Sequence, residues 1–357
     1  MALALALGRR GLGRTWPNPA VGALVVKDAS IVGRGWTQPG GRPHAETEAL
    51  ARAGAAARAA TLYVSLEPCS HHGRTPPCVD AIIEAGIARV VSPMADPNPR
   101  VAGRGHWKLA EAGVVVEVGI GAEEARRAHA GHVRRMRDGR PHTILKLASS
   151  ADGKVALSGR RPVGITGEAA RRRVHLMRSM NDAVATGIGT VLADDPQLTC
   201  RLPGMHSPVR IVFDARLRLP LASRLVASAS ATPVWLVTGD SASQSPELAL
   251  KARGVEVLRV QEAAGRIDLL AALKLLAERG LTRVLFETGP VLATALLKAD
   301  LVDEAMLFRS PMVIGPDGID ALEGLPLSAL TRSPHMQPVA TEAVGIDTVE
   351  MFERPVF

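Results

Sequence analysis

Two cysteines, one histidine and one glutamate carry the clearest candidate chemistry in this chain. His44 and Glu46 belong to an H-A-E triplet, and Cys69 and Cys78 lie at the ends of the stretch C-S-H-H-G-R-T-P-P-C. Imidazole nitrogen and thiolate sulfur are ligands that zinc prefers, and three protein ligands leave its fourth position to water. A glutamate two residues beyond the histidine reaches that water instead of the metal. The pattern predicts a zinc site with ligands His44, Cys69 and Cys78 and with Glu46 as catalytic acid and base.

The spacing of the two cysteines is the unusual part of this pattern. Zinc deaminases combine an H-x-E triplet with P-C-x-x-C, whereas eight residues separate Cys69 from Cys78 here. We expect Cys78 to open the following helix, because Pro76 and Pro77 suit a helix entrance. Both thiolates then reach one metal, and the carboxylate of Glu46 moves protons from the bound water to a leaving amine. The sequence therefore predicts hydrolytic deamination.

Two histidines between the cysteines leave an alternative open. His71 and His72 lie in a polar loop beside Arg74, where they are either solvated or in contact with a substrate phosphate or ring. A structural zinc protein without turnover would instead need a fourth protein ligand, for which these histidines are the spare candidates.

The bulk composition favours a two-domain protein that acts on small molecules. The chain has 357 residues, a net charge of +8 and only 3% aromatic residues. Its basic residues are dispersed, and the densest groups, 134–137 and 171–173, are expected to form solvated helix faces. A nucleic-acid deaminase or RNA-binding protein remains the alternative from another class, which salt-sensitive RNA binding would support. We expect no nucleic acid and no membrane as partners.

Three cysteines in a chain of this length do not form a disulfide framework, so a reducing cytoplasm is expected. Cys200 is interpreted as a free buried thiol. The apolar N-terminus, residues 1–10, lacks a basic leader and a small-residue cleavage site, and it is interpreted as an amphipathic helix.

Apolar patterning divides the chain into two α/β halves. The first half predicts a hairpin, then alternating helices and strands, with ranges 21–36, 45–57, 61–66, 79–85, 89–91, 107–112, 114–116 and a charged helix 123–137. The turn cluster 138–141 marks a boundary, which gives domains 1–139 and 142–357. In the second half, strands are expected at 143–147, 209–213, 234–237, 255–260, 283–286, 305–308 and 347–352, and helices at 168–180, 246–252, 269–278 and 291–297.

The second half contains weaker signals of its own. Residues 187–189 read G-I-G, which is too little for a dinucleotide fingerprint. Residues 286–295, F-E-T-G-P-V-L-A-T-A, predict a strand that leads through Gly-Pro into an apolar helix. The free N–H groups at such a helix start suit a dinucleotide phosphate, although a plain strand-helix turn has the same pattern.

Five stretches together resemble the bifunctional deaminase/reductase family of bacterial riboflavin biosynthesis. They are T-W-P-N-P-A-V-G (15–22), H-A-E (44–46), E-P-C-S-H-H-G-R-T-P-P-C (67–78), D-P-N-P-R-V-A-G-R-G (96–105) and T-V-L-A-D-D-P-Q-L-T (190–199). The resemblance covers nearly the whole chain, and the long cysteine spacing is itself typical of this family. It implies a cytidine-deaminase-like three-layer α/β/α domain followed by a dihydrofolate-reductase-like α/β domain.

The resemblance also implies two consecutive reactions on a small phosphorylated pyrimidine. The zinc domain would remove the 2-amino group of 2,5-diamino-6-(ribosylamino)-4(3H)-pyrimidinone 5'-phosphate. The second domain would then use NADPH to reduce the ribosyl group, giving 5-amino-6-(5-phospho-ribitylamino)uracil. A homodimer or higher homo-oligomer is expected by family likeness only.

Site residues of the second domain are carried over by the same resemblance. The positions that match cofactor contacts are Ala148, Gly164, Thr190, Asp194, Gly289, Pro290, Val291, Leu292, Ala293, Thr294 and Ala295. The positions that match substrate contacts are Asn18, Pro162, Arg178, Leu198, Arg201 and Glu287. Lys146 is our candidate for a polar group near the reacting carbon. The chain departs from the family pattern at 160–164, R-R-P-V-G, where a tryptophan expected to pack on the cofactor is missing.

Overall fold

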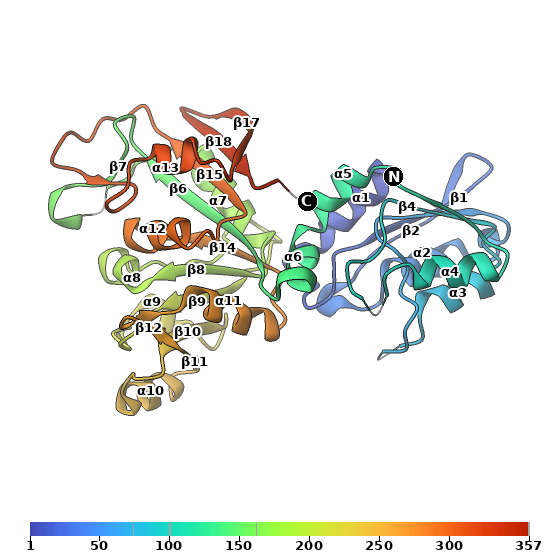
Figure 1. Cartoon of the computed structure of the whole chain (residues 1–357), viewed down its shortest axis with the longest axis horizontal. Helices are drawn as coiled ribbons and strands as arrows, with labels where there is room; N and C mark the ends of the chain where they lie inside the picture. Colours follow the sequence, from blue (N-terminus) through green and yellow to red (C-terminus); the bar gives the residue numbers. More distant parts are fainter. Residues whose placement is uncertain (74, 100, 162, 356–357) are drawn as a thin grey trace. The chain divides into compact units, whose positions relative to one another are not determined.

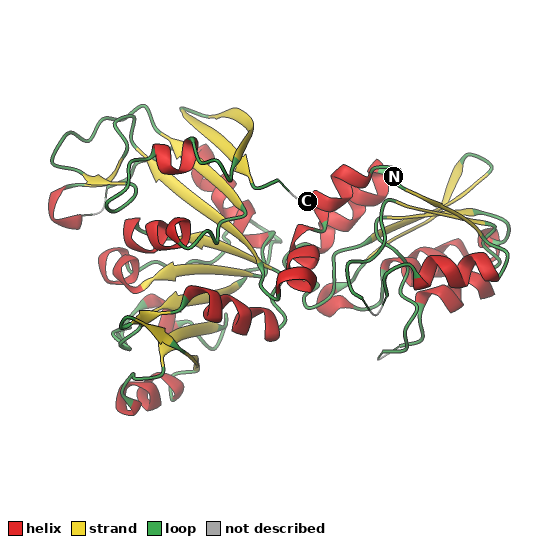
Figure 2. Ribbon diagram, viewed as in Figure 1, coloured by secondary structure: helices red, strands yellow, loops and turns green. Residues whose placement is uncertain are grey.

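The computed structural model describes residues 1–73, 75–99, 101–161 and 163–355 of the chain (Figure 1). The chain forms two compact units, Met1–Gly139 and Arg140–Pro355. Each unit has a sheet of its own, with helices packed against its strands (Figure 2). The boundary falls inside the Asp-Gly-Arg-Pro turn cluster, where Gly139 ends a helix in the left-handed conformation that glycine adopts without strain.

The first unit is built on a mixed sheet with the strand order β2-β1-β3-β4-β5 among the described residues. Its strands are β1 (Gly22–Lys27), β2 (Ser30–Trp36), β3 (Thr61–Val64), β4 (Arg89–Ser92) and β5 (Val115–Val118). Its helices are α1 (Ala2–Gly8), α2 (Ala45–Ala53), α3 (Cys78–Glu84), α4 (Arg104–Glu111), α5 (Ala122–Ala128) and α6 (Ala130–Asp138), with short 3₁₀ turns η1 (Arg9–Gly11), η2 (Pro39–Gly41) and η3 (Gly54–Ala57). β3, β4 and β5 are parallel, and β1 is antiparallel to both of its neighbours.

The alternation of side chains along β1 produces three layers. Ala23 and Val25 point to one face, where they join a core with α2, α3 and α4. Leu24 points to the opposite face, where it packs against Ala4 and Leu7 of α1. Helices therefore cover both faces of the sheet, and the starts of α2 and α3 lie on the same face.

The second unit has a larger sheet with the order β11-β10-β9-β8-β14-β6-β15-β18-β17 among the described residues. Its strands are β6 (His142–Ser149), β8 (Ala183–Gly187), β9 (Val209–Phe213), β10 (Val234–Gly239), β11 (Val255–Val260), β14 (Arg283–Glu287), β15 (Glu304–Arg309), β17 (Gln337–Val344) and β18 (Asp347–Glu353). The strands from β11 to β15 pair in parallel, and β18 and β17 form an antiparallel edge. Two small ribbons pair β7 (Lys154–Ala156) with β16 (Ile319–Asp320) and β12 (Glu262–Ala263) with β13 (Arg266–Ile267).

Most helices of the second unit lie between successive strands of the parallel part of this sheet. The helices are α7 (Glu168–Ser179), α8 (Ile188–Asp194), α9 (Arg224–Ala227), α10 (Gln244–Lys251), α11 (Leu269–Glu278), α12 (Pro290–Lys298) and α13 (Ser328–Thr331), with a 3₁₀ turn η4 (Ser158–Arg160). Helix α13 instead precedes the antiparallel strand β17. The core is aliphatic, as the scarcity of aromatic residues requires, and includes Val184, Leu236 and Leu285.

The predicted long helix 123–137 is wrong, because it is two helices that break at His129. The imidazole is buried, with Nε2 2.8 Å from the Ser65 carbonyl oxygen, and its Nδ1 has no partner among the described residues. The backbone leaves helical geometry at this residue (φ −99°, ψ 15°). A tertiary hydrogen bond thus overrides a local pattern that favours one continuous helix.

Burial of His129 makes the first unit sensitive to acid. Burial, reinforced by His132, lowers the pKa of His129 to about 4. Since the unfolded pKa is near 6.5, stability from the neutral ring is complete above that value and is lost as pH falls toward 4. The loss reaches about 3 kcal/mol. Urea unfolding at pH 7 and pH 5 should show the wild type losing more stability than His129→Gln, which keeps a donor for Ser65.

Three of the four tryptophans, Trp16, Trp36 and Trp107, lie in this unit, and Trp235 lies in the second, so Trp235→Phe is used as the background in which fluorescence follows the first unit. His72→Gln, at an exposed position, is the control and should behave as the wild type. An identical loss of stability in His129→Gln and wild type would show that another group causes the acid sensitivity.

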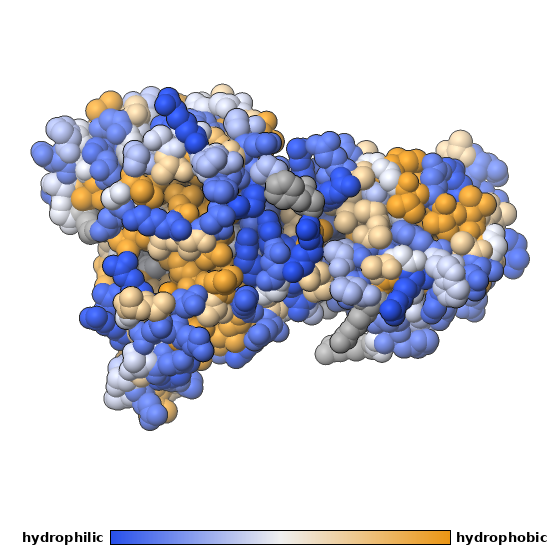
Figure 3. Space-filling view, viewed as in Figure 1, coloured by the Kyte–Doolittle hydropathy of each residue, from blue (hydrophilic) through white to orange (hydrophobic). Residues whose placement is uncertain are grey.

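On the face that Figure 3 draws, polar residues predominate and hydrophobic residues gather in smaller groups among them. Exposed apolar side chains of the first unit include Val115 and Val118 of the edge strand β5. Within the described ranges, no helix has both the length and the apolarity to cross a membrane.

Candidate functional site

A histidine and two cysteines meet at one point of the first unit. The Nδ1 atom of His44 lies 3.3 Å from Cys78 Sγ and 3.6 Å from Cys69 Sγ. These three ligand atoms all lie within 4.8 Å of one another. The structure therefore brings together the three residues that the sequence assigns to zinc.

Helix starts and one returning loop position these ligands. His44 is the N-cap of α2, and Cys78 is the first residue of α3, as its preceding prolines predict. The backbone N–H of Cys78 donates to Cys69 Sγ over 3.2 Å, and that of Val79 donates to the Cys69 carbonyl over 3.3 Å. The chain thus returns to Cys69 at Cys78 and Val79, despite the eight residues that separate the two cysteines in the sequence.

The electrostatics of the cluster suit a cation. Hydrogen bonds from the Cys78 thiol, then His44 and the Cys78 N–H, lower the pKa of Cys69 to about 4 against the effect of burial. The same contact with Cys69 raises the pKa of Cys78, and the Cys69 sulfur raises the pKa of His44. The lowered pKa favours the thiolate form of Cys69, which is the form that binds a metal. This donor set fits Zn²⁺.

Glu46 lies in the first turn of α2 and is only 4% exposed. Burial raises the pKa of its carboxyl, and the charge of His44 opposes that effect. Glu46 and Asn18 line the same pocket as the ligands His44 and Cys69. Asn18 Nδ2 donates to the Gly41 carbonyl over 2.8 Å, which fixes the amide at the pocket wall.

A wall of this pocket comes from α6, which the sequence assigned only as a charged helix. His132, Arg135 and Met136 all line the pocket, so the interpretation of 134–137 as a solvated face is wrong for Arg135. His132 Nε2 lies 2.9 Å from Asp96 Oδ1. The i, i+3, i+4 spacing of these residues was the available signal, because it places them on one helix face.

The histidines of the cysteine loop differ in position. His71 is exposed and lines the pocket, whereas His72 is exposed without being part of its lining. Arg74 lies outside the described residues. Among those that are described, the ligand cluster has three members, which is an open set of the kind that catalytic zinc sites have.

In the second unit, three charged side chains gather near the carboxyl ends of β6 and β14. Glu287 pairs in register with Lys146 on the neighbouring strand. Arg178 of α7 donates to both carboxylate oxygens of Glu287, over 2.6 and 2.7 Å, and to the Thr199 carbonyl over 2.8 Å. Lys146 also lies over the Phe308 ring at 5.5 Å.

This cluster is half-buried, with side-chain exposures of 12% for Arg178 and 11% for Glu287, and its partial burial affects its charges. Burial lowers the pKa of Lys146, while the charge of Glu287 opposes it. Burial alone would raise the pKa of Glu287, but its bonds to Arg178 and the charges around it hold that pKa below the usual range. The carboxylate is therefore held ionised beside an ammonium group whose proton is less firmly bound than in water.

Two strand-to-helix turns meet beside this cluster. β8 and β14 are parallel neighbours, and each leads directly into a helix. The Gly289 N–H donates to Thr190 Oγ1 over 3.0 Å, and the Gly187 N–H donates to Thr288 Oγ1 over 3.2 Å. Gly289 is the N-cap of α12 and Pro290 its first residue. The structure thus places Thr190 against the Gly289 turn.

The remaining sequence-assigned positions are less closely grouped. Within α12, Val291 is exposed, Leu292 and Ala295 are half-buried, and Ala293 and Thr294 are buried. Asp194, Arg201 and Gly164 are exposed, whereas Leu198 is buried with a left-handed φ of 55°. Ala148 is half-buried on β6, in register with Phe308. Pro162 lies outside the described residues.

Comparisons with known proteins cover both units. Residues 1–94 match the model of the cytidine and deoxycytidylate deaminase zinc-binding region, and residues 141–349 match that of the RibD C-terminal domain. Riboflavin biosynthesis protein RibD of Escherichia coli (strain K12) is 43% identical, over 97% of this chain and 96% of its own. RibD of Aquifex aeolicus (strain VF5) is 39% identical, over 99% and 97%.

Solved structures agree over the same length. Acinetobacter baumannii RibD, form 1, superposes with a TM-score of 0.88 at 35% identity, covering 99% of this chain and 98% of that one. A diaminohydroxyphosphoribosylaminopyrimidine deaminase/5-amino-6-(5-phosphoribosylamino)uracil reductase from Thermotoga maritima gives a TM-score of 0.86 at 35% identity, over 99% and 97%.

The two units thus define a class, a zinc-binding deaminase domain joined to a reductase domain in one polypeptide. Their predicted fold classes, cytidine-deaminase-like and reductase-like α/β, are confirmed. The chain belongs to the RibD family and acts as a bifunctional deaminase and reductase of riboflavin biosynthesis.

Proposed function

We propose that the first unit removes the 2-amino group of 2,5-diamino-6-(ribosylamino)-4(3H)-pyrimidinone 5'-phosphate. The second unit then reduces the ribosyl side chain with NADPH, giving 5-amino-6-(5-phospho-ribitylamino)uracil. The name of the Thermotoga maritima relative states these two substrate types for that protein. The observation that carries the proposal is the grouping of His44, Cys69 and Cys78 around a pocket that also holds the buried carboxylate of Glu46.

In the deaminase pocket, His44, Cys69 and Cys78 would hold the zinc ion. When bound there, zinc supplies a hydroxide nucleophile near neutral pH. Glu46 accepts the proton that the attacking water gives up and delivers it to the leaving amine, so that ammonia departs uncharged. Asn18, whose amide is fixed by Gly41, orients the pyrimidine ring at the pocket wall.

Basic side chains at this pocket fit the phosphate of the substrate. Arg42, His71 and Arg135 all line the pocket that holds Glu46. Arginine's planar fork of N–H donors matches phosphate oxygens, and two such groups at one pocket attract a dianion. These positions account for part of the positive charge of the chain without a nucleic-acid partner.

In the reductase unit, the Gly289 turn would hold a cofactor phosphate. The Gly289 N–H is bound to Thr190, and Pro290 has no N–H. The groups available to an anion are therefore those of Val291 and Leu292 in the first turn of the nine-residue helix α12, where the helix dipole is positive. Thr190 fixes the turn through its bond from the Gly289 N–H. Lys146 and Glu287 then face the sugar carbon that accepts the hydride. Lys146 holds a proton for the sugar ring oxygen, whose bond to that carbon breaks in the reduction.

Arg178 acts chiefly through Glu287 in this proposal. Three of its N–H groups already bind Glu287 and Thr199, so the guanidinium orients the carboxylate toward the substrate. Leu198 and Arg201 lie close to Thr199 in the sequence. Arg201 is exposed, so its side chain can reach a substrate phosphate.

Two activities of one purified protein test the proposal. Wild-type protein should release ammonia from the diaminopyrimidine phosphate, and it should oxidise NADPH faster than NADH with the deaminated product. Chelation of zinc should abolish ammonia release and leave NADPH oxidation unchanged, and added Zn²⁺ should restore the first activity. Ammonia release by protein shown to be zinc-free would overturn the assignment of the metal.

Replacing Arg178 by methionine should reduce kcat/KM of the reductase about 100-fold, since small displacements of a reacting group have effects of this size. Methionine fills similar space but leaves Glu287 without its two donors. Arg172→Met on the same helix is the control, because that side chain is 74% exposed. A reductase rate in Arg178→Met equal to that of the control would remove Arg178 from the site.

A further inference from the structure

We propose that Glu67 is a positioning residue of the deaminase site, which holds the loop that carries Cys69 against the segment 96–106 of the pocket lining. The inference rests on the proposed zinc site, because it treats Cys69 as a ligand. Glu67 precedes Cys69 by two residues, and its side chain is completely buried.

Among the described residues, the carboxylate of Glu67 accepts hydrogen bonds from four backbone N–H groups of one segment, 96–106. Its Oε2 accepts from Asp96 over 2.8 Å and from Gly103 over 2.9 Å, and its Oε1 accepts from Gly105 over 2.8 Å and from His106 over 3.4 Å. A carboxylate accepts at both oxygens, which no neutral side chain of this size does. Both oxygens are used, so the charge and the shape of Glu67 suit this segment.

The segment that Glu67 holds forms part of the pocket. Asp96, Asn98 and Val101 line the pocket together with His44, and Asp96 Oδ1 also contacts His132 on α6. Glu67 therefore connects the residues before Cys69 with the segment 96–106 and, through Asp96, with His132 of α6.

Two independent contacts tie the same loop to α4. Lys108 Nζ donates to the Ser70 carbonyl over 2.9 Å, immediately after Cys69. Gly105 packs so closely that a Cβ there would lie 2.2 Å from the Pro68 carbonyl oxygen, immediately before Cys69. The backbone on both sides of the ligand is thus fixed by the first turns of α4.

Cys69 needs this support because it lies in a loop. Cys78 begins α3 and His44 caps α2, so regular elements orient those two ligands. Groups that orient metal ligands from outside change metal affinity or activity 10- to 100-fold when removed, by the usual order of magnitude. The carboxylate also lies at the start of α4, where a negative charge stabilises the helix.

Glu67→Gln in the full-length, zinc-loaded protein tests the inference. Glutamine replaces one acceptor oxygen by an NH₂ group that faces two N–H donors, so two of the four bonds are lost. We expect faster hydrogen–deuterium exchange at residues 96–106. Zinc affinity, measured by competition with a chromophoric chelator, and kcat/KM for ammonia release should each fall about 10- to 100-fold. Reductase activity should not change.

Glu111→Gln, an exposed carboxyl at the end of α4, is the matched control. The inference is overturned if Glu67→Gln lowers only the thermal midpoint and leaves zinc affinity and ammonia release at the control level. If Glu67→Gln does not fold, the zinc affinity of Lys108→Met is measured instead. An affinity at least about threefold weaker than that of the wild type supports the inference, and an unchanged affinity refutes it. Wild-type protein that binds zinc without releasing ammonia would refute the proposed reaction but not the role of Glu67. Hydrogen–deuterium exchange at residues 96–106 and zinc affinity would still measure that role.

Discussion

Glu46→Gln is expected to lower the rate of ammonia release about 1,000-fold while the protein keeps its zinc. Glutamine preserves the size of the side chain and its place in the first turn of α2, but it cannot accept and return a proton. Transfer of protons by a positioned carboxylate contributes roughly 10²- to 10⁴-fold to rates of this kind. Glu46 is buried beside His44 in the pocket, so water has little room to substitute for it. Ammonia release and zinc content are measured on the same preparation.

Glu48→Gln is the matched control, because it makes the same chemical change two residues along α2. Glu48 pairs with Arg52 at 2.9 Å on the solvent side of the helix, so its loss should alter ammonia release less than twofold. Zinc content reports whether the first unit of either variant is folded, and reductase activity reports whether the protein is correctly quantified. Rapid ammonia release by zinc-loaded Glu46→Gln would show that another group transfers the proton.

The zinc ligands could be predicted because their chemistry and their helix-start signals are local. An H-x-E triplet at a helix start and a cysteine after two prolines each identify a position without knowledge of the fold. α3 begins at Cys78 as those prolines indicate. The structure adds that the loop between the cysteines returns Cys78 to Cys69 through a backbone N–H.

The reductase cluster could not be derived in this way. Lys146, Arg178 and Glu287 come from β6, α7 and β14, and no spacing along the chain relates them. Only the pairing of β6 with β14 and the path of α7 bring them together. The family resemblance assigned Arg178 and Glu287 to the substrate site. The ion pair between these two side chains is visible only in the structure.

Two errors in the secondary structure predicted from the sequence have physical causes. β8, the sequence A-V-A-T-G, was not predicted, because its small residues have weak strand propensity, although it lies between β9 and β14 in the sheet. Burial on both faces and pairing on both edges stabilise it instead. The helix break at His129 was missed for a related reason, since a buried side-chain bond to Ser65 decides it.

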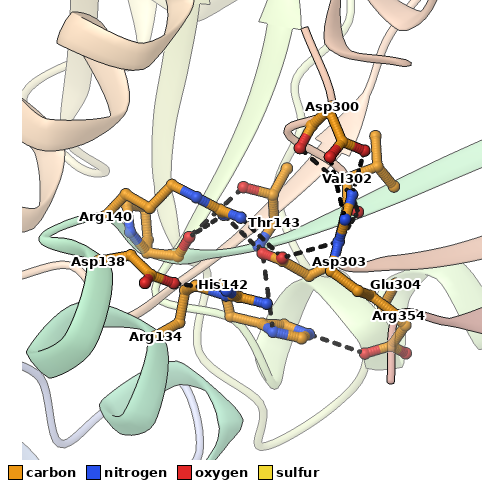
Figure 4. Close-up of polar contacts among 11 residues, drawn as sticks. Arg134, Asp138, Arg140, His142, Thr143, Asp300, Val302, Asp303, Glu304 and Arg354 are labelled. Atoms are coloured by element: carbon orange, nitrogen blue, oxygen red, sulfur yellow. Dashed lines mark hydrogen bonds and ion pairs between the residues drawn. The ribbon is translucent and has the colours of Figure 1, made fainter. Parts of the chain in front are cut away.

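Asp303→Asn is expected to destabilise the reductase unit by about 3–5 kcal/mol, because it leaves a buried guanidinium unpaired. Asp303 is 1% exposed at its side chain and accepts from both Nη atoms of Arg140, over 2.6 and 2.8 Å (Figure 4). The Thr143 N–H donates to the same carboxylate over 2.9 Å. Asparagine has one acceptor oxygen and directs an NH₂ group toward these donors. The urea midpoint for loss of NADPH oxidation measures the effect, and ammonia release is the internal reference.

Asp300→Asn distinguishes this buried pair from an ordinary surface pair. Asp300 contacts Arg354 but is 54% exposed, so its loss should cost less than about 1 kcal/mol. The double variant Arg140→Met, Asp303→Leu removes both charges and should recover most of the stability that Asp303→Asn loses. If the double variant is as unstable as the single one, the cost comes from the lost Thr143 bond or from packing and not from an unpaired charge. The buried pair would then orient the start of β6 through the backbone, with Arg140 contributing little to the free energy of unfolding.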